Sequence, residues 1–185
     1  RGVYTETGEL EALEGFITDI TEQREHKREL EETNAVLSTL FKTLPVGILA
    51  EDADRNVLAA NQRMFDLFEM PGSPNEVVGA DCERMAREVS PVFADSDGFV
   101  ERIDDLVSNR EPTDAEELSL VDGGTFERSY RPLRLPNGNG HLWTYRDTTE
   151  RTERERELEA RTEELAELTV ELEEQYRHLF EEAPV

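Results

Sequence analysis

Two parts of the chain repeat at a nearly constant interval, and this repetition limits the possible folds more than any other sequence feature. Asp19-Ile20-Thr21-Glu22 reappears 128 residues later as Asp147-Thr148-Thr149-Glu150, and residues 40–46 resemble residues 179–185, which lie 139 residues further on. A unit of about 130 residues therefore repeats: the tail of one copy, a whole copy and the head of a third. Because the chain starts at Arg1 without a methionine, we expect it to be an excised segment of a longer protein.

A charged run follows each copy of the repeat and is predicted to be a helix. In both runs an Asp is followed three residues later by a Glu, Asp19 with Glu22 and Asp147 with Glu150, which is the spacing of a capping box. Apolar residues also recur every seven residues. The first run has Leu30, Leu37 and Leu44, with Leu40 and Phe41 in the second seam position; the second has Leu158, Leu165, Leu172 and Leu179, with Leu168 and Tyr176.

An apolar stripe on a helix rich in Glu and Arg favours a partner helix, so a dimeric coiled coil is the preferred interpretation. The alternative is that each helix packs on its own domain. The second linker is longer than the first by 11 residues. Eleven residues make about three complete helical turns. The second linker helix would therefore enter its next domain with nearly the same side facing that domain as the first linker helix does.

The segment between the two charged runs alternates short apolar stretches with turn signals. Residues 46–51 and 57–60 are predicted to form a hairpin, and strands are expected at 116–121, 125–135 and 142–146. Asn61 is predicted to cap a helix that ends at Pro71-Gly72, and Asp97 to open a second helix up to Arg110, with irregular pieces through Pro91 between them. The predicted fold class is α+β: a five-stranded antiparallel sheet with helices on one face, flanked by long coiled-coil-type helices.

The charge balance excludes several classes of partner. Asp and Glu total 44 against 20 Lys and Arg, which gives a net charge of −24. Nucleic acid and anionic membrane surfaces require a basic footprint, so neither is expected to bind. The same acidity, with lysine only at positions 27 and 42, favours a halophilic source. No apolar run is long enough for a membrane span, and the single cysteine fits a reducing, cytoplasmic compartment.

Five short motifs, in this order and spacing, resemble the PAS family: Leu40-Phe41 through Leu44-Pro45-Val46-Gly47-Ile48, Ala60-Asn61-Gln62, Val77-Val78-Gly79, Asp122-Gly123 and Asp147-x-Thr149. The resemblance implies a five-stranded antiparallel sheet whose helical face encloses a small cavity. PAS domains commonly occur in tandem, dimerise through flanking helices and regulate histidine kinases. The implied domains are the tail of a preceding PAS domain (1–22), a linker helix (23–43), the PAS domain (44–149), a second linker helix (150–178) and the start of a following PAS domain (179–185).

Gly79-Ala80-Asp81-Cys82-Glu83-Arg84 is similar to the Gly-x-Asn-Cys-Arg motif of flavin-binding PAS domains, with Asp81 and Glu83 in place of Asn and Arg. Those domains hold the polar edge of the flavin with two Asn and one Gln. The matching positions here are Leu118, Phe126 or Arg128, and Tyr145, and a leucine cannot form these hydrogen bonds. Flavin is therefore not expected, and Cys82 is predicted to be a small, partly buried residue.

Haem is not expected either, because the predicted helix 97–110 lacks a histidine that could serve as an axial ligand. His141, at the start of a strand beside a turn, is predicted to be exposed.

Because side chains alternate along a strand, one face of each of the last three predicted strands should point into the cavity. These faces carry Leu118 and Leu120 on the first strand, Phe126, Arg128 and Tyr130 on the second, and Trp143 and Tyr145 on the third. Together with residues from the two helices, the candidate pocket consists of Met64, Phe68, Phe99, Ile103, Leu118, Leu120, Phe126, Arg128, Tyr130, Trp143 and Tyr145. Aromatic walls with an arginine and tyrosine hydroxyls suit a small aromatic or carboxylate ligand. The alternative is that these residues simply fill the core and that Arg128 extends its guanidinium to solvent.

The predicted function is that of a sensory and dimerising PAS module in a cytoplasmic multi-PAS protein of the two-component type, which signals through its flanking helices to neighbouring PAS domains and to a histidine kinase or related output. Asp147, Thr149 and Glu150 are the candidate cap and relay residues. A ligand-free structural and dimerisation spacer is the alternative. No catalytic or metal-binding arrangement is recognised. His26 lacks the following proline of a phosphoacceptor motif, so the segment itself is not expected to be an enzyme.

Overall fold

The computed structural model describes residues 2–7, 10–13, 21–136 and 138–181. The chain divides into two compact units, residues 1–41 and 42–185. In the first unit, β1 (Gly2–Tyr4) and β2 (Leu10–Leu13) pair as an antiparallel hairpin. The helix α1 (Thr21–Thr43) exposes Leu30, Leu37 and His26 and carries an ion pair between Arg28 and Glu32 at 2.9 Å. The predicted cap Asp19 lies outside the described residues, as do 14–20 and 182–185 of the predicted flanking domains.

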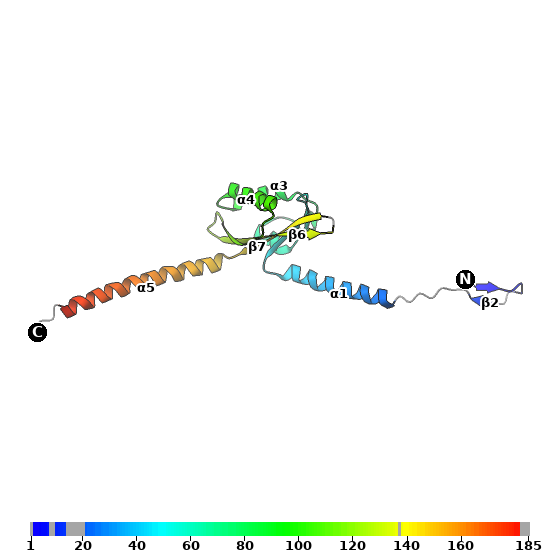
Figure 1. Cartoon of the computed structure of the whole chain (residues 1–185), viewed down its shortest axis with the longest axis horizontal. Helices are drawn as coiled ribbons and strands as arrows, with labels where there is room; N and C mark the ends of the chain where they lie inside the picture. The colour runs from blue at the N-terminus through cyan, green and yellow to red at the C-terminus, as the bar shows by residue number, and fades with distance from the viewer. Residues whose placement is uncertain (1, 8–9, 14–20, 137, 182–185) are drawn as a thin grey trace. The chain divides into compact units, whose positions relative to one another are not determined.

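The second unit is built on a five-stranded antiparallel sheet, as predicted from the sequence (Figure 1). Its strands are β3 (Gly47–Glu51), β4 (Val57–Ala60), β5 (Thr113–Ser119), β6 (Thr125–Leu135) and β7 (Gly138–Asp147), in the spatial order β4-β3-β7-β6-β5. The two ends of the domain sequence therefore meet at the centre of the sheet, where β3 pairs with β7 from Gly47↔Tyr145 to Glu51↔His141. The strand β5 lies at one edge.

Asn61 caps the first helix of the domain, α2 (Gln62–Leu67), as predicted: its side chain accepts the Met64 N–H. The same amide accepts the Ile48 N–H at 2.8 Å and donates to the Val46 carbonyl at 2.8 Å, so it also ties the helix to β3. The helix ends at Leu67, which is earlier than the predicted stop at Pro71-Gly72. Glu69 then adopts a positive φ of 50°, which is incompatible with a continuing helix.

Two expectations for the other helices are wrong. The region predicted as irregular contains the helices η1 (Pro74–Val77), α3 (Cys82–Val89) and η2 (Ser90–Val92). Asp81 caps α3 by accepting the N–H groups of Glu83 and Arg84. The long helix α4 (Ser96–Asn109) starts just before Asp97, because Asp95 is the residue that accepts the Gly98 N–H.

The helices α3 and α4 lie over one face of the sheet (Figure 1), and the hydrophobic core fills the space between the two layers. Burial of this one face, rather than of both, accounts for the alternation of buried and less buried residues along β6 and β7. Four of the five core phenylalanines contact one another in tilted, edge-to-face and stacked geometries: Phe68, Phe93, Phe99 and Phe126.

The last helix, α5 (Thr149–Glu181), is 33 residues long and begins almost directly after β7. Its seven-residue stripe is exposed in the single chain: Leu158, Leu165 and Leu172 are 60%, 58% and 53% exposed. The side chain of Leu179, the next residue of this predicted stripe, is outside the described part. The structure thus confirms the five-stranded antiparallel sheet with helices.

Candidate functional site

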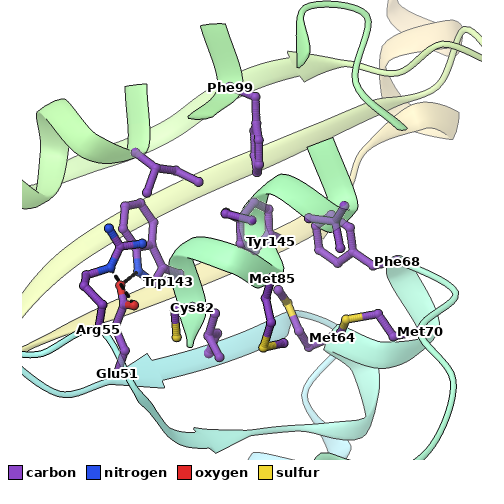
Figure 2. A pocket seen from close by; sticks show the side chains of 14 residues that line it. Glu51, Arg55, Met64, Phe68, Met70, Cys82, Met85, Phe99, Trp143 and Tyr145 are labelled. Atoms are coloured by element: carbon purple, nitrogen blue, oxygen red, sulfur yellow. Dashed lines mark hydrogen bonds and ion pairs between the residues drawn. The ribbon is translucent and has the colours of Figure 1, made fainter. Parts of the chain in front are cut away.

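A small cavity lies between the helices and the central strands. Its volume is about 30 Å³, far below the range of about 300–1,000 Å³ that is usual for small-molecule sites. Figure 2 shows side chains from α2, α3, α4 and the sheet converging on this space. Six of the predicted pocket residues line it: Met64, Phe68, Phe99, Ile103, Trp143 and Tyr145. Eight further lining residues were not predicted: Leu49, Glu51, Arg55, Met70, Cys82, Met85, Ala86 and Val89.

The other five predicted residues do not line this cavity. Phe126 and Tyr130 are buried in the core, where Phe126 meets Phe68 edge-to-face at 5.8 Å and Tyr130 meets Trp143 at 4.5 Å between ring centroids. Leu118 and Leu120 are partly buried against the core. Arg128 points toward a separate groove, described below. The predicted pocket is therefore divided between a nearly filled interior and a more open site at its margin.

A buried carboxylate, Glu51, forms one wall of the cavity. It is 0% exposed, and its two oxygens accept separate hydrogen bonds: Oε1 from the Trp143 indole N–H at 2.5 Å and Oε2 from the Arg55 Nε–H at 2.9 Å. Dashed lines in Figure 2 mark these bonds. Arg55 also lies 3.7 Å from Asp104 on α4. A buried charge of this kind is tolerated because it is paired and hydrogen-bonded.

Cys82 lines the same cavity and is 3% exposed, so it is more deeply buried than the sequence suggested. Burial raises the pKa of its thiol, and the nearby Glu51 carboxylate raises it further. The thiol therefore stays protonated at neutral pH, and a protonated, buried thiol is a poor nucleophile.

His141 is buried, which contradicts the predicted exposure. It is 3% exposed, and its Nδ1 lies 2.8 Å from the Tyr130 hydroxyl. Burial lowers the pKa of His141, an effect that the Glu51 carboxylate opposes and that Arg110 and Arg55 reinforce. The prediction failed because position in the sequence, next to a turn, does not reveal that β3 and β6 flank this residue on both sides.

A cluster of three charged residues, Arg102, Glu116 and Arg128, lies at the margin of the core. Arg128 donates to Glu116 Oε2 from Nε at 3.0 Å and from Nη2 at 2.7 Å, and Arg102 Nε donates to Oε1 at 2.8 Å. The Arg128 side chain is 0% exposed, so the alternative in which it reaches solvent is wrong. Burial alone would raise the pKa of Glu116, but the hydrogen bonds from Arg102 and Arg128 outweigh it and lower this pKa.

Tyr145 lines the interior cavity and is the register partner of Arg128 in the pairing of β6 with β7. Burial raises the pKa of its phenol to about 12, although Arg128 acts in the opposite direction. Its ring meets Phe68 edge-to-face at 5.1 Å. The hydroxyl is thus protonated over the whole physiological range, and Tyr145 can act as a hydrogen-bond donor but not as a base.

The start of α5 is hydrogen-bonded directly to β6. The Thr148 N–H donates to the Thr125 carbonyl at 2.9 Å, and the Thr125 N–H donates to Thr149 Oγ1 at 3.0 Å. Arg151 on α5 pairs with Glu127 on β6. Asp147 accepts the Thr149 N–H at 3.0 Å, whereas Glu150 pairs with Arg154 instead of completing the predicted capping box. Sequence reasoning named Asp147, Thr149 and Glu150 but missed the partners of this junction on β6.

Within residues 2–7, 10–13, 21–136 and 138–181, no cluster of three or more His, Cys, Asp or Glu side chains is arranged to hold a metal ion. No helix in the same described ranges is both long and apolar enough to cross a membrane.

Comparison with known proteins identifies the fold. The family model described as "PAS fold" matches residues 41–153. No curated protein sequence matches the chain. Among solved structures, the PAS domain of an HTR-like protein from Haloarcula marismortui is similar, with 23% identity, a TM-score of 0.48, and coverage of 67% of this chain and 98% of that one.

Two other solved structures show similar relationships. A domain of a sensory box sensor histidine kinase/response regulator from Geobacter sulfurreducens has 22% identity, a TM-score of 0.41, and coverage of 64% of this chain and 96% of that one. An RNA-binding light-oxygen-voltage receptor has 19% identity, a TM-score of 0.50, and coverage of 82% and 41%. At these identities the structural likeness speaks only for the fold. Because the family model covers more than half of the 185 residues, the chain belongs to the PAS fold family.

Proposed function

We propose that the chain is a sensory and dimerising module of a cytoplasmic multi-PAS signalling protein, which relays a signal through its flanking helices to a histidine kinase or related output. The observation that carries this proposal is the junction between β6 and α5. A change in the sheet that moves Thr125 must act on Thr148 and Thr149, because backbone and side-chain hydrogen bonds join them at 2.9 and 3.0 Å. The acidic composition, with a net charge of −24, supports a haloarchaeal source.

Dimerisation is proposed to occur through α5 of two copies. The stripe of Leu158, Leu165 and Leu172 is exposed on a helix that is otherwise rich in Glu and Arg. Exposed leucines at seven-residue spacing are stabilised when they pack into the equivalent stripe of another helix. A helix joined to the sheet at its start and to a second copy along its length would couple the two domains.

A small organic ligand remains part of the proposal, and flavin and haem do not. The cavity of about 30 Å³ is far smaller than either cofactor, and apolar Leu118 stands at a position where flavin-binding relatives have a hydrogen-bonding side chain. The nearly filled interior also favours the alternative function, a ligand-free structural and dimerisation spacer. Native mass spectrometry of the purified chain separates the two, since a retained small molecule contradicts the spacer.

Analytical ultracentrifugation over a range of protein concentrations tests the dimer. We expect a dimer for the wild type and a shift to monomer for Leu165→Lys. Val170→Lys is the matched control, because Val170 is equally exposed (57%) on the same helix but lies off the leucine stripe. A wild type that stays monomeric at all concentrations, or equal effects of the two substitutions, contradicts dimerisation through this stripe.

A further inference from the structure

A groove outside the interior cavity offers the room that the interior lacks. It lies between the start of α4 and the edge strand β5 and has a volume of about 430 Å³. This lies within the range of about 300–1,000 Å³ that small-molecule sites usually occupy. Phe93, Phe99 and Leu118 supply its apolar lining, and Arg102, Glu116 and Arg128 supply the charged part.

The charged part of the groove is organised around one carboxylate. Glu116 receives three hydrogen bonds from the two guanidinium groups, two from Arg128 and one from Arg102. Arg128 is 0% exposed and its Cζ lies 5.3 Å from the centroid of the Phe99 ring. A buried guanidinium without a counter-ion is strongly unfavourable. Some carboxylate must therefore stay at this position, but nothing in the chemistry requires that it belong to the protein.

Glu116 occupies this position from a strand that can release it. Since β5 is an edge strand, β6 is its one neighbour in the sheet, and outside this ladder the Ala94 N–H donates to the Ser119 carbonyl at the far end of β5, at 2.9 Å. The pairing of β5 with β6 also shifts register between Thr113 and Glu116, and Ala115 has a positive φ of 49°. A non-glycine residue with this backbone conformation is strained. Movement of Glu116 into solvent would leave the ladders between the central strands intact.

Replacement of Glu116 by a ligand would conserve charge. With Glu116 withdrawn, the groove retains Arg102 and Arg128 against Asp95 and Glu117. A monocarboxylate restores the original balance, whereas a dianion adds a negative charge beside two carboxylates. The Gly98 N–H at the start of α4 does not contribute, because Asp95 already accepts it at 2.9 Å.

We propose that this groove binds a small aromatic monocarboxylate, whose carboxylate displaces Glu116 from between Arg102 and Arg128 and whose ring lies against Phe93, Phe99 and Leu118. The aromatic body is inferred from the lining, since aromatic side chains favour ring contacts in offset or edge-to-face geometry. Displacement of Glu116 would shift the position of β5. Through the β5–β6 ladder it would also shift β6, the strand to which the start of α5 is hydrogen-bonded. The signalling consequence rests on the proposed function, but the binding itself does not.

Benzoate is the probe, and the site is followed by the Nε–H resonances of Arg102 and Arg128 in NMR titrations of the full chain at constant ionic strength. We expect saturable shifts of both resonances in the wild type. In Glu116→Ala, which has no internal carboxylate to displace, we expect the affinity for benzoate to rise at least tenfold. Benzoate should also raise the melting temperature of this variant, which starts below that of the wild type. If Glu116→Ala does not fold, Glu116→Gln takes its place with the same expected direction.

Two controls make the outcome decisive. Glu88→Ala removes an exposed acid on α3, which lies outside the groove and pairs with Arg84 at 3.5 Å, and should leave the affinity within about twofold of the wild type. Benzamide, the neutral counterpart of the probe, should not shift the arginine resonances. Equal benzoate affinity in the wild type and Glu116→Ala, absence of saturable binding to either one, or equal binding of benzamide overturns the proposal. None of these results affects the ultracentrifugation test, which measures α5, so failure of the site is distinguishable from failure of the proposed dimeric module.

Discussion

Trp143 on β7 donates its indole N–H to the buried carboxylate of Glu51 on β3, with 2.5 Å between the two heavy atoms. The residues are 92 positions apart in the chain, and the bond joins two adjacent strands at the centre of the sheet. The second oxygen of Glu51 accepts from Arg55 at 2.9 Å. This single carboxylate thus satisfies one buried neutral donor and one largely buried cation.

Glu51→Ala is expected to lower the free energy of unfolding by about 3 kcal/mol, because it leaves the Trp143 N–H and the Arg55 guanidinium without their acceptor. This is the lower end of the usual range, since the Arg55 side chain retains 15% exposure. Glu51→Gln keeps one acceptor and should cost less. Urea denaturation measures both, with the exposed Glu117→Ala as control, expected within about 0.5 kcal/mol of the wild type. Equal effects of Glu51→Ala and Glu117→Ala would contradict the buried network.

The buried pair of Tyr130 and His141 predicts a pH dependence of stability. Burial lowers the pKa of His141 in the folded state, whereas in the unfolded chain the histidine has a pKa of about 6.5. Between these two values the unfolded state binds more protons, so stability must fall as the pH is lowered from above 6.5 toward the folded-state pKa. Below the folded-state pKa this contribution levels off, because both states are then protonated.

Denaturation curves of the wild type and His141→Gln between pH 8 and pH 5 test this expectation. The glutamine can still hydrogen-bond the Tyr130 hydroxyl but does not titrate, so the difference between the two proteins isolates the histidine. His26→Gln, on the exposed surface of α1, is the matched control and should follow the wild type. An unchanged pH slope in His141→Gln rules out the histidine as its source.

Local signals in the sequence were enough to predict the five-stranded sheet and the Asn61 cap of α2, but not the caps of α3 and α4, which are Asp81 and Asp95. Asn61 follows a short apolar run and precedes an amphipathic stretch, so its role at the start of α2 could be predicted. The helix α3 was not predicted because half of its eight residues, Cys82 to Val89, are charged and the segment is too short for a clear periodic pattern.

The polar contents of the candidate site could not be predicted in the same way, because they depend on strand order. Glu51 ends its strand next to a polar turn and has the sequence context of a surface acid, but β7 inserts beside β3 and covers it. Alternation correctly placed Arg128 on the side of its strand that faces the core. Alternation alone did not show that Glu116 pairs with Arg128. That contact depends on the register between β5 and β6, which places Glu116 directly opposite Arg128.

The junction between the sheet and α5 predicts a specific effect of Thr149→Val. Valine has nearly the same shape but cannot accept the Thr125 N–H, which is then a buried donor without a partner. Its loss should lower the free energy of unfolding by about 1–2 kcal/mol and speed hydrogen exchange at the Thr125 amide. Thr162→Val is the control, because the Thr162 hydroxyl bonds only to the Leu158 carbonyl on the exposed surface of α5. If the Thr125 amide stays as protected in Thr149→Val as in Thr162→Val, the hydroxyl does not hold this junction.

The strained backbone at Ala115 predicts that Ala115→Gly stabilises the fold. Ala115 is exposed and has a φ of 49°, and its N–H donates to the Ser129 hydroxyl at 3.0 Å, a bond that glycine preserves. The left-handed conformation costs an L-residue about 1–2 kcal/mol, whereas glycine adopts it freely at a smaller entropic cost. We expect a gain of about 0.5–1 kcal/mol in urea denaturation. Ala59→Gly, at a residue of β4 without a positive φ, should instead lose about that amount. Losses of equal size in both variants would mean that Ala115 does not keep the left-handed conformation in solution, and the strain that favours release of Glu116 would then be absent.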